Sequence, residues 1–150
     1  MLALVLWAGA ALSGVLLSFT KSSGWFLWVY AQVAVLDAYS QIFGQLVGRH
    51  RLAPSISPAK TWEGAAGGFV SSLLAGTLLR GLSDLDWLPA LLLAAAIAVT
   101  AIVSDLAAAK YKRRSGVKDY GRLIPGHGGV VDRFNSLFGV VLAAGLAALI

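Results

Sequence analysis

Long hydrophobic runs without charge are the feature that most constrains this 150-residue chain. Only 13% of its residues are charged, whereas a soluble domain carries roughly a quarter. Five runs approach the roughly 20 residues that a helix needs to cross hydrocarbon. They cover about Met1–Thr20, Trp25–Val47, Gly64–Leu79, Trp87–Val103 or slightly beyond, and Phe134–Ile150. The sequence therefore predicts an all-α fold, a polytopic transmembrane helical bundle of about five spans, as a single domain over residues 1–150.

The first and third of these runs allow more specific predictions. Met1–Thr20 lacks a basic amino-terminal region and a convincing cleavage site, so we interpret it as a membrane span and not as a signal peptide. The third run opens with Gly64-Ala-Ala-Gly67-Gly68. Small residues let membrane helices approach closely, so this segment predicts a helix-packing face. The chain has no cysteine, which excludes disulfides and thiolate metal sites.

Basic residues concentrate in two polar loops between the predicted spans. The loops cover residues 48–63 and 110–133 and hold ten of the twelve Lys and Arg residues. Lys21 and Arg80 lie on the other side of the predicted membrane. By the positive-inside rule both basic loops are cytoplasmic. We expect an integral protein of a bacterial inner (plasma) membrane, with its chemistry at the cytoplasmic face.

The second loop has the composition of a phosphate site. Its turn Pro125-Gly126-His127-Gly128-Gly129 offers backbone N–H groups that phosphate can approach, and His127 can donate to phosphate or exchange a proton. Asp105 and Asp132 bracket the loop, and two carboxylates at adjoining helix ends can share Mg²⁺. The simpler alternatives are an ordinary glycine turn and carboxylates that only pair with nearby basic residues.

Cations in the same loop can neutralise phosphate charge, arginine as a bidentate fork and lysine as a point charge. The candidates are Lys112, Arg113, Lys118 and Arg133. The alternative is contact with anionic lipid, which we favour for Arg114 and Arg122. Asp119 is expected to orient a basic side chain or a metal-bound water.

Two further candidates precede this loop. Asp37 lies near the middle of the second span, where a carboxylate needs a partner or a wet cavity and is a functional residue by default. Ser57-Pro58 resembles a helix cap followed by proline at the first helical position, which would bring Lys60 near a helix amino end.

These residues resemble the phosphatidate cytidylyltransferase (CDP-diacylglycerol synthase) family. Its pattern of Lys-Arg, four residues, Lys-Asp, then Pro-x-His-Gly-Gly, two residues and Asp-Arg is matched from Lys112 to Arg133. A second block matches Asp37, Phe43-Gly44, Leu52-Ala53-Pro54, Ser57-Pro58, Lys60-Thr61-Trp62 and Gly64. The family's Gly-Asp stands here as Ser104-Asp105, and the resemblance covers about residues 33–140. The chain resembles the catalytic carboxyl-terminal half of longer members.

The resemblance implies transfer of a cytidylyl group from CTP to phosphatidate, with release of pyrophosphate. It implies Mg²⁺ on Asp105 and Asp132, and catalytic roles for these residues with Lys118, Asp119 and His127. Substrate contacts are implied for Asp37, Lys60, Lys112, Arg113, Gly126, Gly128, Gly129 and Arg133. The expected partners are CTP, phosphatidate or a related lipid phosphate, and membrane lipids. A homodimer stays open, and no nucleic-acid partner is expected.

Three departures leave alternatives to this function. Ala109 stands where the pattern has serine, Ala108 where it is often acidic, and Asn135 where it ends on aspartate. They keep open a non-catalytic paralogue that binds anionic lipid, and an enzyme that acts on another lipid phosphate.

Overall fold

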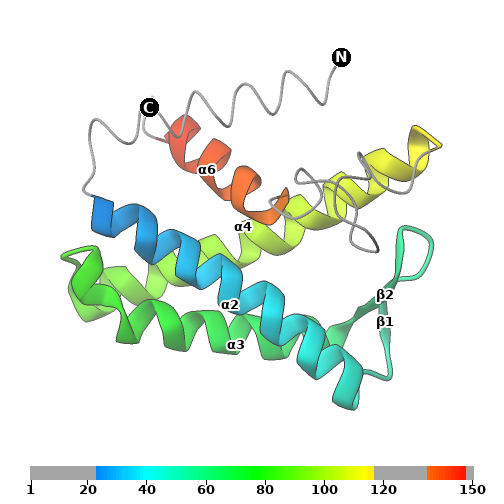
Figure 1. Ribbon diagram of the computed structural model, residues 1–150, viewed down its shortest axis with the longest axis horizontal. Helices are drawn as coiled ribbons and strands as arrows, with labels where there is room; N and C mark the ends of the chain where they lie inside the picture. The colour runs from blue at the N-terminus through cyan, green and yellow to red at the C-terminus, as the bar shows by residue number, and fades with distance from the viewer. Residues whose placement is uncertain (1–22, 117–134, 148–150) are drawn as a thin grey trace.

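Three long helices that alternate in direction pack together in the computed structural model, which describes residues 23–116 and 135–147 (Figure 1). They are α2 (Ser23–Val47), α3 (Trp62–Leu78) and α4 (Trp87–Arg114). A fourth helix, α6 (Asn135–Ala147), packs on α4. The single turn η1 (Arg80–Leu82) leads from α3 toward α4. Helices at four of the predicted positions are therefore confirmed, while Met1–Thr20 lies outside the described residues.

A small hairpin corrects the expectation that the segment between α2 and α3 is a loop within an all-α fold. Strand β1 (Arg51–Ala53) pairs antiparallel with β2 (Ser57–Thr61). Pro58 is tolerated here because a two-stranded hairpin consists of edge strands, in which a missing N–H need not break a ladder. The predicted helix start at Ser57-Pro58 is wrong. The true cap is Thr61, whose hydroxyl accepts a hydrogen bond from the Gly64 backbone N–H at 3.1 Å.

Helix α4 extends further than the apolar run that predicted it. It continues to Arg114, so Lys110, Lys112 and Arg113 lie on its last turns and not in a loop. Alanines favour helix, and basic side chains suit a helix carboxyl end. Its 28 residues measure about 42 Å, more than the roughly 30 Å of hydrocarbon. The carboxyl end of α4 therefore reaches well past the apolar segment.

Glycine and serine form the surface of α3 that faces α2. Every fourth residue along α3 is buried, and this buried row consists of Gly64, Gly68, Ser72 and Gly76. At Gly67 a Cβ atom would lie 2.4 Å from the Phe43 ring of α2. The helix-packing face predicted from Gly64 to Gly68 is thus confirmed, and it allows close contact of the two backbones.

The larger core side chains come from α2, α4 and α6. Trp28, Val33 and Leu36 of α2 are almost fully buried and pack with residues such as Ile97 of α4 and Val140 of α6. The Trp28 indole N–H donates to the Gly76 carbonyl at 2.8 Å, which joins α2 to α3. These contacts hold α2 against α3, α4 and α6.

The outer surface of the bundle remains strongly apolar. Exposed large side chains include Leu46, Leu74, Leu78, Leu88 and Leu92. Large apolar patches are rare on soluble monomers, whereas lipid accommodates exposed apolar side chains. Within residues 23–116 and 135–147, α4 is the helix that is long and apolar enough to cross a membrane.

Gly68→Ala is expected to destabilise the bundle by about 1–3 kcal/mol, the usual cost of overpacking. A Cβ atom at Gly68 would lie 1.9 Å from the Ser40 hydroxyl and 2.6 Å from the Leu36 carbonyl oxygen. The hydroxyl can rotate away, but the carbonyl belongs to the backbone of α2. Thermal unfolding in detergent micelles measures the effect. Gly81→Ala is the matched control, since nothing lies within 4 Å of its added Cβ. Equal stability of the two variants would contradict the packing argument.

Candidate active site at the hairpin end of the bundle

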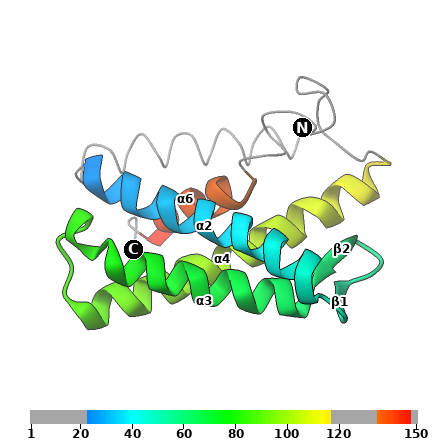
Figure 2. The same ribbon diagram turned by 60° about the horizontal axis from the view of Figure 1, so that its bottom comes forward.

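The candidate residues gather at the end of the bundle that carries the hairpin. Figures 1 and 2 show the hairpin beside the carboxyl-terminal part of α4, at the end where α2 finishes and α3 begins. The Arg113 Nε–H of α4 donates to the Ile56 carbonyl of the hairpin turn at 3.3 Å. The hairpin is thereby tied to the helix that carries Asp105.

Lys60 and Asp105 form an ion pair between the hairpin and α4. The ammonium of Lys60 donates to the Asp105 carboxylate, although the two residues are 45 positions apart. About a third of each side chain is exposed, so the pair is open on one side. Burial lowers the pKa of Lys60 from its ordinary value; the Asp37 charge partly opposes this, and the Lys112 charge lowers it further. Lys60, Asp105, Asp37 and Lys112 therefore belong to one electrostatic cluster.

Asp37 obtains its partner from α6. The Ser136 hydroxyl lies 3.0 Å from Oδ2 and 3.2 Å from Oδ1 of the Asp37 carboxylate and donates to it. This contact joins residues 99 positions apart in the sequence. The sequence predicted that the Asp37 carboxylate needs a partner, and that partner is a serine that the sequence reasoning did not single out.

Helix α6 approaches α4 closely one residue before Asp105. A Cβ atom at Gly139 would lie 1.8 Å from the Ser104 hydroxyl and 2.3 Å from the Ser104 Cβ. The absence of a side chain at Gly139 therefore sets how near α6 comes to this part of α4.

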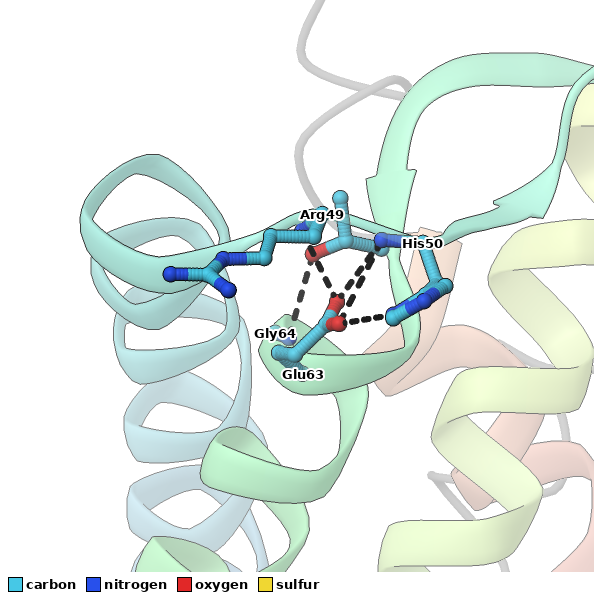
Figure 3. Close-up of polar contacts among 5 residues, drawn as sticks. Arg49, His50, Glu63 and Gly64 are labelled. Atoms are coloured by element: carbon cyan, nitrogen blue, oxygen red, sulfur yellow. Dashed lines mark hydrogen bonds and ion pairs between the residues drawn. The ribbon is translucent and has the colours of Figure 1, made fainter.

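A carboxylate clamp holds the junction between α2 and the hairpin. Oε2 of Glu63, in the first turn of α3, accepts hydrogen bonds from the backbone N–H groups of Arg49 and His50 at 3.2 Å each. Oε1 lies 2.6 Å from the Nδ1 of His50. Figure 3 shows that the Arg49 guanidinium points away from Glu63, so its backbone makes the contact. We call Glu63 with these groups of Arg49 and His50 the Glu63 clamp.

The Glu63 clamp predicts an acid transition centred near pH 2. The His50 contact, aided by the backbone N–H groups, lowers the pKa of Glu63 to about 2. Because the folded pKa is depressed, the clamp's stabilisation is complete above about pH 4.5 and is lost as the pH falls through 2. The amide proton shifts of Arg49 and His50, measured by NMR, should titrate together in this range. Glu63→Gln should abolish that titration; its persistence would assign it to another group.

Several predicted site residues lie outside the described residues. They are Lys118, Asp119, Gly126, His127, Gly128, Gly129, Asp132 and Arg133. The predicted sharing of a cation by Asp105 and Asp132 therefore stays a prediction. Among the residues that the structure describes, no three His, Cys, Asp or Glu side chains gather in a way that could hold a metal ion.

Sequence reasoning missed the contacts that assemble this end of the bundle. Ser136, the Glu63 clamp and the Thr61 cap were not singled out. A threonine and then a glutamate before an apolar run is a recognisable helix-start signal, since carboxylates favour the first helical turn. No local signal points to Ser136, because its partner is 99 residues away.

A family model and individual relatives both show similarity of this chain to cytidylyltransferases. Residues 1–149 match the cytidylyltransferase family. A phosphatidate cytidylyltransferase of Staphylococcus haemolyticus is 39% identical over 127 residues, which cover 81% of this chain and 48% of the relative. A phosphatidate cytidylyltransferase of Mycobacterium bovis is 38% identical over 83% of this chain and 41% of its own length. That of Haemophilus influenzae is 36% identical over 77% and 42%. The chain thus spans less than half the length of these curated relatives.

Proposed function

The chain belongs to the cytidylyltransferase family, and from that membership we propose that it transfers a cytidylyl group from CTP to phosphatidate. The products are CDP-diacylglycerol and pyrophosphate. The observation that carries the proposal is the Lys60–Asp105 pair, which joins the two family motif blocks at one end of the bundle.

The reaction is a phosphoryl-type substitution. An oxygen of the phosphatidate phosphate attacks the α-phosphorus of CTP and forms a new P–O bond. The bond from the α-phosphorus to the oxygen bridging it to the β-phosphate breaks, and its electron pair leaves with pyrophosphate. Such a reaction needs positioning and charge stabilisation more than covalent work by the protein.

Cations at the hairpin end supply that stabilisation. Lys60, Lys112 and Arg113 come from β2 and from the last turns of α4. We assign them to substrate phosphates, together with Lys118, Arg133 and the Gly126–Gly129 turn. Asp37 would orient Lys60, since its negative charge acts on the ammonium.

The residues fit Mg²⁺ as a partial ligand set. Asp105 offers a carboxylate that is about a third exposed at the site. Mg²⁺ commonly takes one or two carboxylates, with water and substrate phosphate as its other ligands. We propose Asp105 and Asp132 as those carboxylates. When bound, the ion supplies positive charge against the phosphate oxygens.

We propose the membrane arrangement that suits this chemistry. The chain would be one domain over residues 1–150, with about five spans in a bacterial inner membrane and the hairpin end in the cytoplasm, where CTP is found. Phosphatidate would keep its acyl tails in hydrocarbon and bring its headgroup to the Lys60–Asp105 pair from the inner leaflet.

Labelled CTP and phosphatidate in detergent micelles, with and without Mg²⁺, test the proposal. We expect Mg²⁺-dependent formation of CDP-diacylglycerol in a one-to-one ratio with pyrophosphate. If turnover in a panel of acceptors occurs only with another lipid phosphate, that lipid and not phosphatidate is the substrate. Salt-sensitive binding of anionic lipid without pyrophosphate release would support the non-catalytic alternative, which Ala108 and Ala109 on α4 keep open.

A further inference from the structure

We propose that Glu63 is a positioning residue: it fixes the backbone on both sides of the hairpin so that Lys60 reaches Asp105. This inference rests on the proposed function of Lys60 at the substrate phosphates. Glu63 itself contacts Arg49 and His50 and is not assigned to substrate.

Glu63 joins two segments that the hairpin separates. Arg49 and His50 follow α2 after Gly48, whereas Glu63 lies in the first turn of α3. The carboxylate accepts both backbone N–H groups, and the His50 imidazole closes the contact from the side (Figure 3). The Glu63 side chain thus holds the residues that precede the hairpin next to the residues that follow it.

Lys60 lies within the segment between these two ends, close to its Glu63 end. The Trp62 N–H donates to the His50 carbonyl at 2.9 Å, and Thr61 pairs with Arg51 in the hairpin. Thr61 is buried, and its neighbour Lys60 extends to α4. A shift of residues 49–51 relative to Glu63 would therefore move the backbone that carries Lys60.

Packing around the hairpin leaves little room for another arrangement of its backbone. A Cβ atom at Gly48 would lie 2.7 Å from the Thr61 hydroxyl oxygen, so the end of α2 already touches the helix cap. At the far side, Arg113 of α4 holds the hairpin turn through the Ile56 carbonyl. The Glu63 clamp and the Arg113 contact together fix the hairpin at its base and at its turn.

A double-mutant cycle distinguishes positioning from mere stabilisation. Since displacement of a reacting group by about 1 Å can cost on the order of 100-fold in rate, we expect Glu63→Ala to lower kcat about 10- to 100-fold, and Glu63→Gln less. In a Lys60→Ala background, Glu63→Ala should change kcat less than about twofold, because the group that it positions is gone. Loss of folded protein alone would lower activity by the same factor in both backgrounds and would overturn the inference.

A distance measurement tests the same idea without activity. The chain has no cysteine, so Ser55→Cys in the hairpin turn and Gly81→Cys at the other end introduce a unique spin-label pair. Both positions are exposed. We expect the pulsed-EPR distance distribution to broaden in Glu63→Gln and in Glu63→Ala. The matched control is Asp86→Asn, whose side chain makes no capping hydrogen bond at the start of α4, and it should leave distances and turnover unchanged.

The two experiments separate the inference from the proposed function. If the parent chain does not turn over CTP, the proposed function fails, and the distance distribution alone then decides whether Glu63 fixes the hairpin. Suppose that the parent chain is active, but that the effects of Glu63→Ala and Lys60→Ala on kcat are independent, or that the EPR distance distribution stays narrow without Glu63. The inference about Glu63 then fails while the proposed function stands.

Discussion

Asp105→Asn is expected to lower CTP-dependent turnover of phosphatidate by about 1,000-fold or more. The change removes a proposed cation ligand and the negative charge that faces Lys60. A metal that stabilises charge in the transition state contributes several kcal/mol, and each 1.36 kcal/mol is a factor of ten in rate. Steady-state release of labelled pyrophosphate from the purified, detergent-solubilised variant gives the measurement.

Asp86→Asn is the matched control for Asp105→Asn. It removes the same kind of charge at the opposite end of α4, away from the hairpin. We expect its turnover to stay within about twofold of the parent chain, since surface changes remote from special contacts have small effects. Near-normal turnover by a correctly folded Asp105→Asn variant would remove Asp105 from the mechanism.

Gly139→Ala is expected to separate α6 from α4 and to cost about 1–3 kcal/mol in the free energy of unfolding. The added methyl group would lie 1.8 Å from the Ser104 hydroxyl oxygen, and even the Ser104 Cβ would be 2.3 Å away. The same displacement would disturb the Ser136–Asp37 hydrogen bond, since Ser136 lies one turn earlier on α6. We therefore expect reduced turnover as well as a lower thermal midpoint.

Ser104→Gly provides the suppressor that tests this packing. Without the Ser104 side chain, the nearest remaining Ser104 atom is Cα at 3.6 Å, an ordinary van der Waals contact. The single change should cost about 0.5 kcal/mol through helix propensity, in addition to the interactions of the Ser104 side chain that it removes. Adding Gly139→Ala to the Ser104→Gly variant should then not lower the midpoint of thermal unfolding any further. If the double variant were as unstable as the sum of the two single variants, the Ser104–Gly139 contact would not be the cause.

The structure also explains why some local predictions failed. Ser57-Pro58 has the residue types of a helix start, yet Ser57 pairs with Ala53 in a hairpin, and the helix begins after Thr61. The loop predicted from Lys110 is helical to Arg114, because alanines and basic residues continue the helix past the apolar run. In both cases the apolar run located the helix but not the residue at which it begins or ends: the start of α3 depends on the hairpin pairing, and the end of α4 on alanines and basic residues outside the apolar run.

The amino-acid sequence by itself determined the apolar helices, the row of small residues on α3 and the two motif blocks that carry the family resemblance. These features depend on residues close together in the chain, where hydrophobic runs and motif spacing act directly. Tertiary structure alone decided that Lys60 reaches Asp105, that Ser136 supplies the partner of Asp37, and that Glu63 fastens the end of α2. Those contacts join segments from 13 to 99 residues apart, and helix packing brings them together. No local sequence pattern specifies contacts between segments so far apart in the chain. These contacts could therefore be identified only from the tertiary structure.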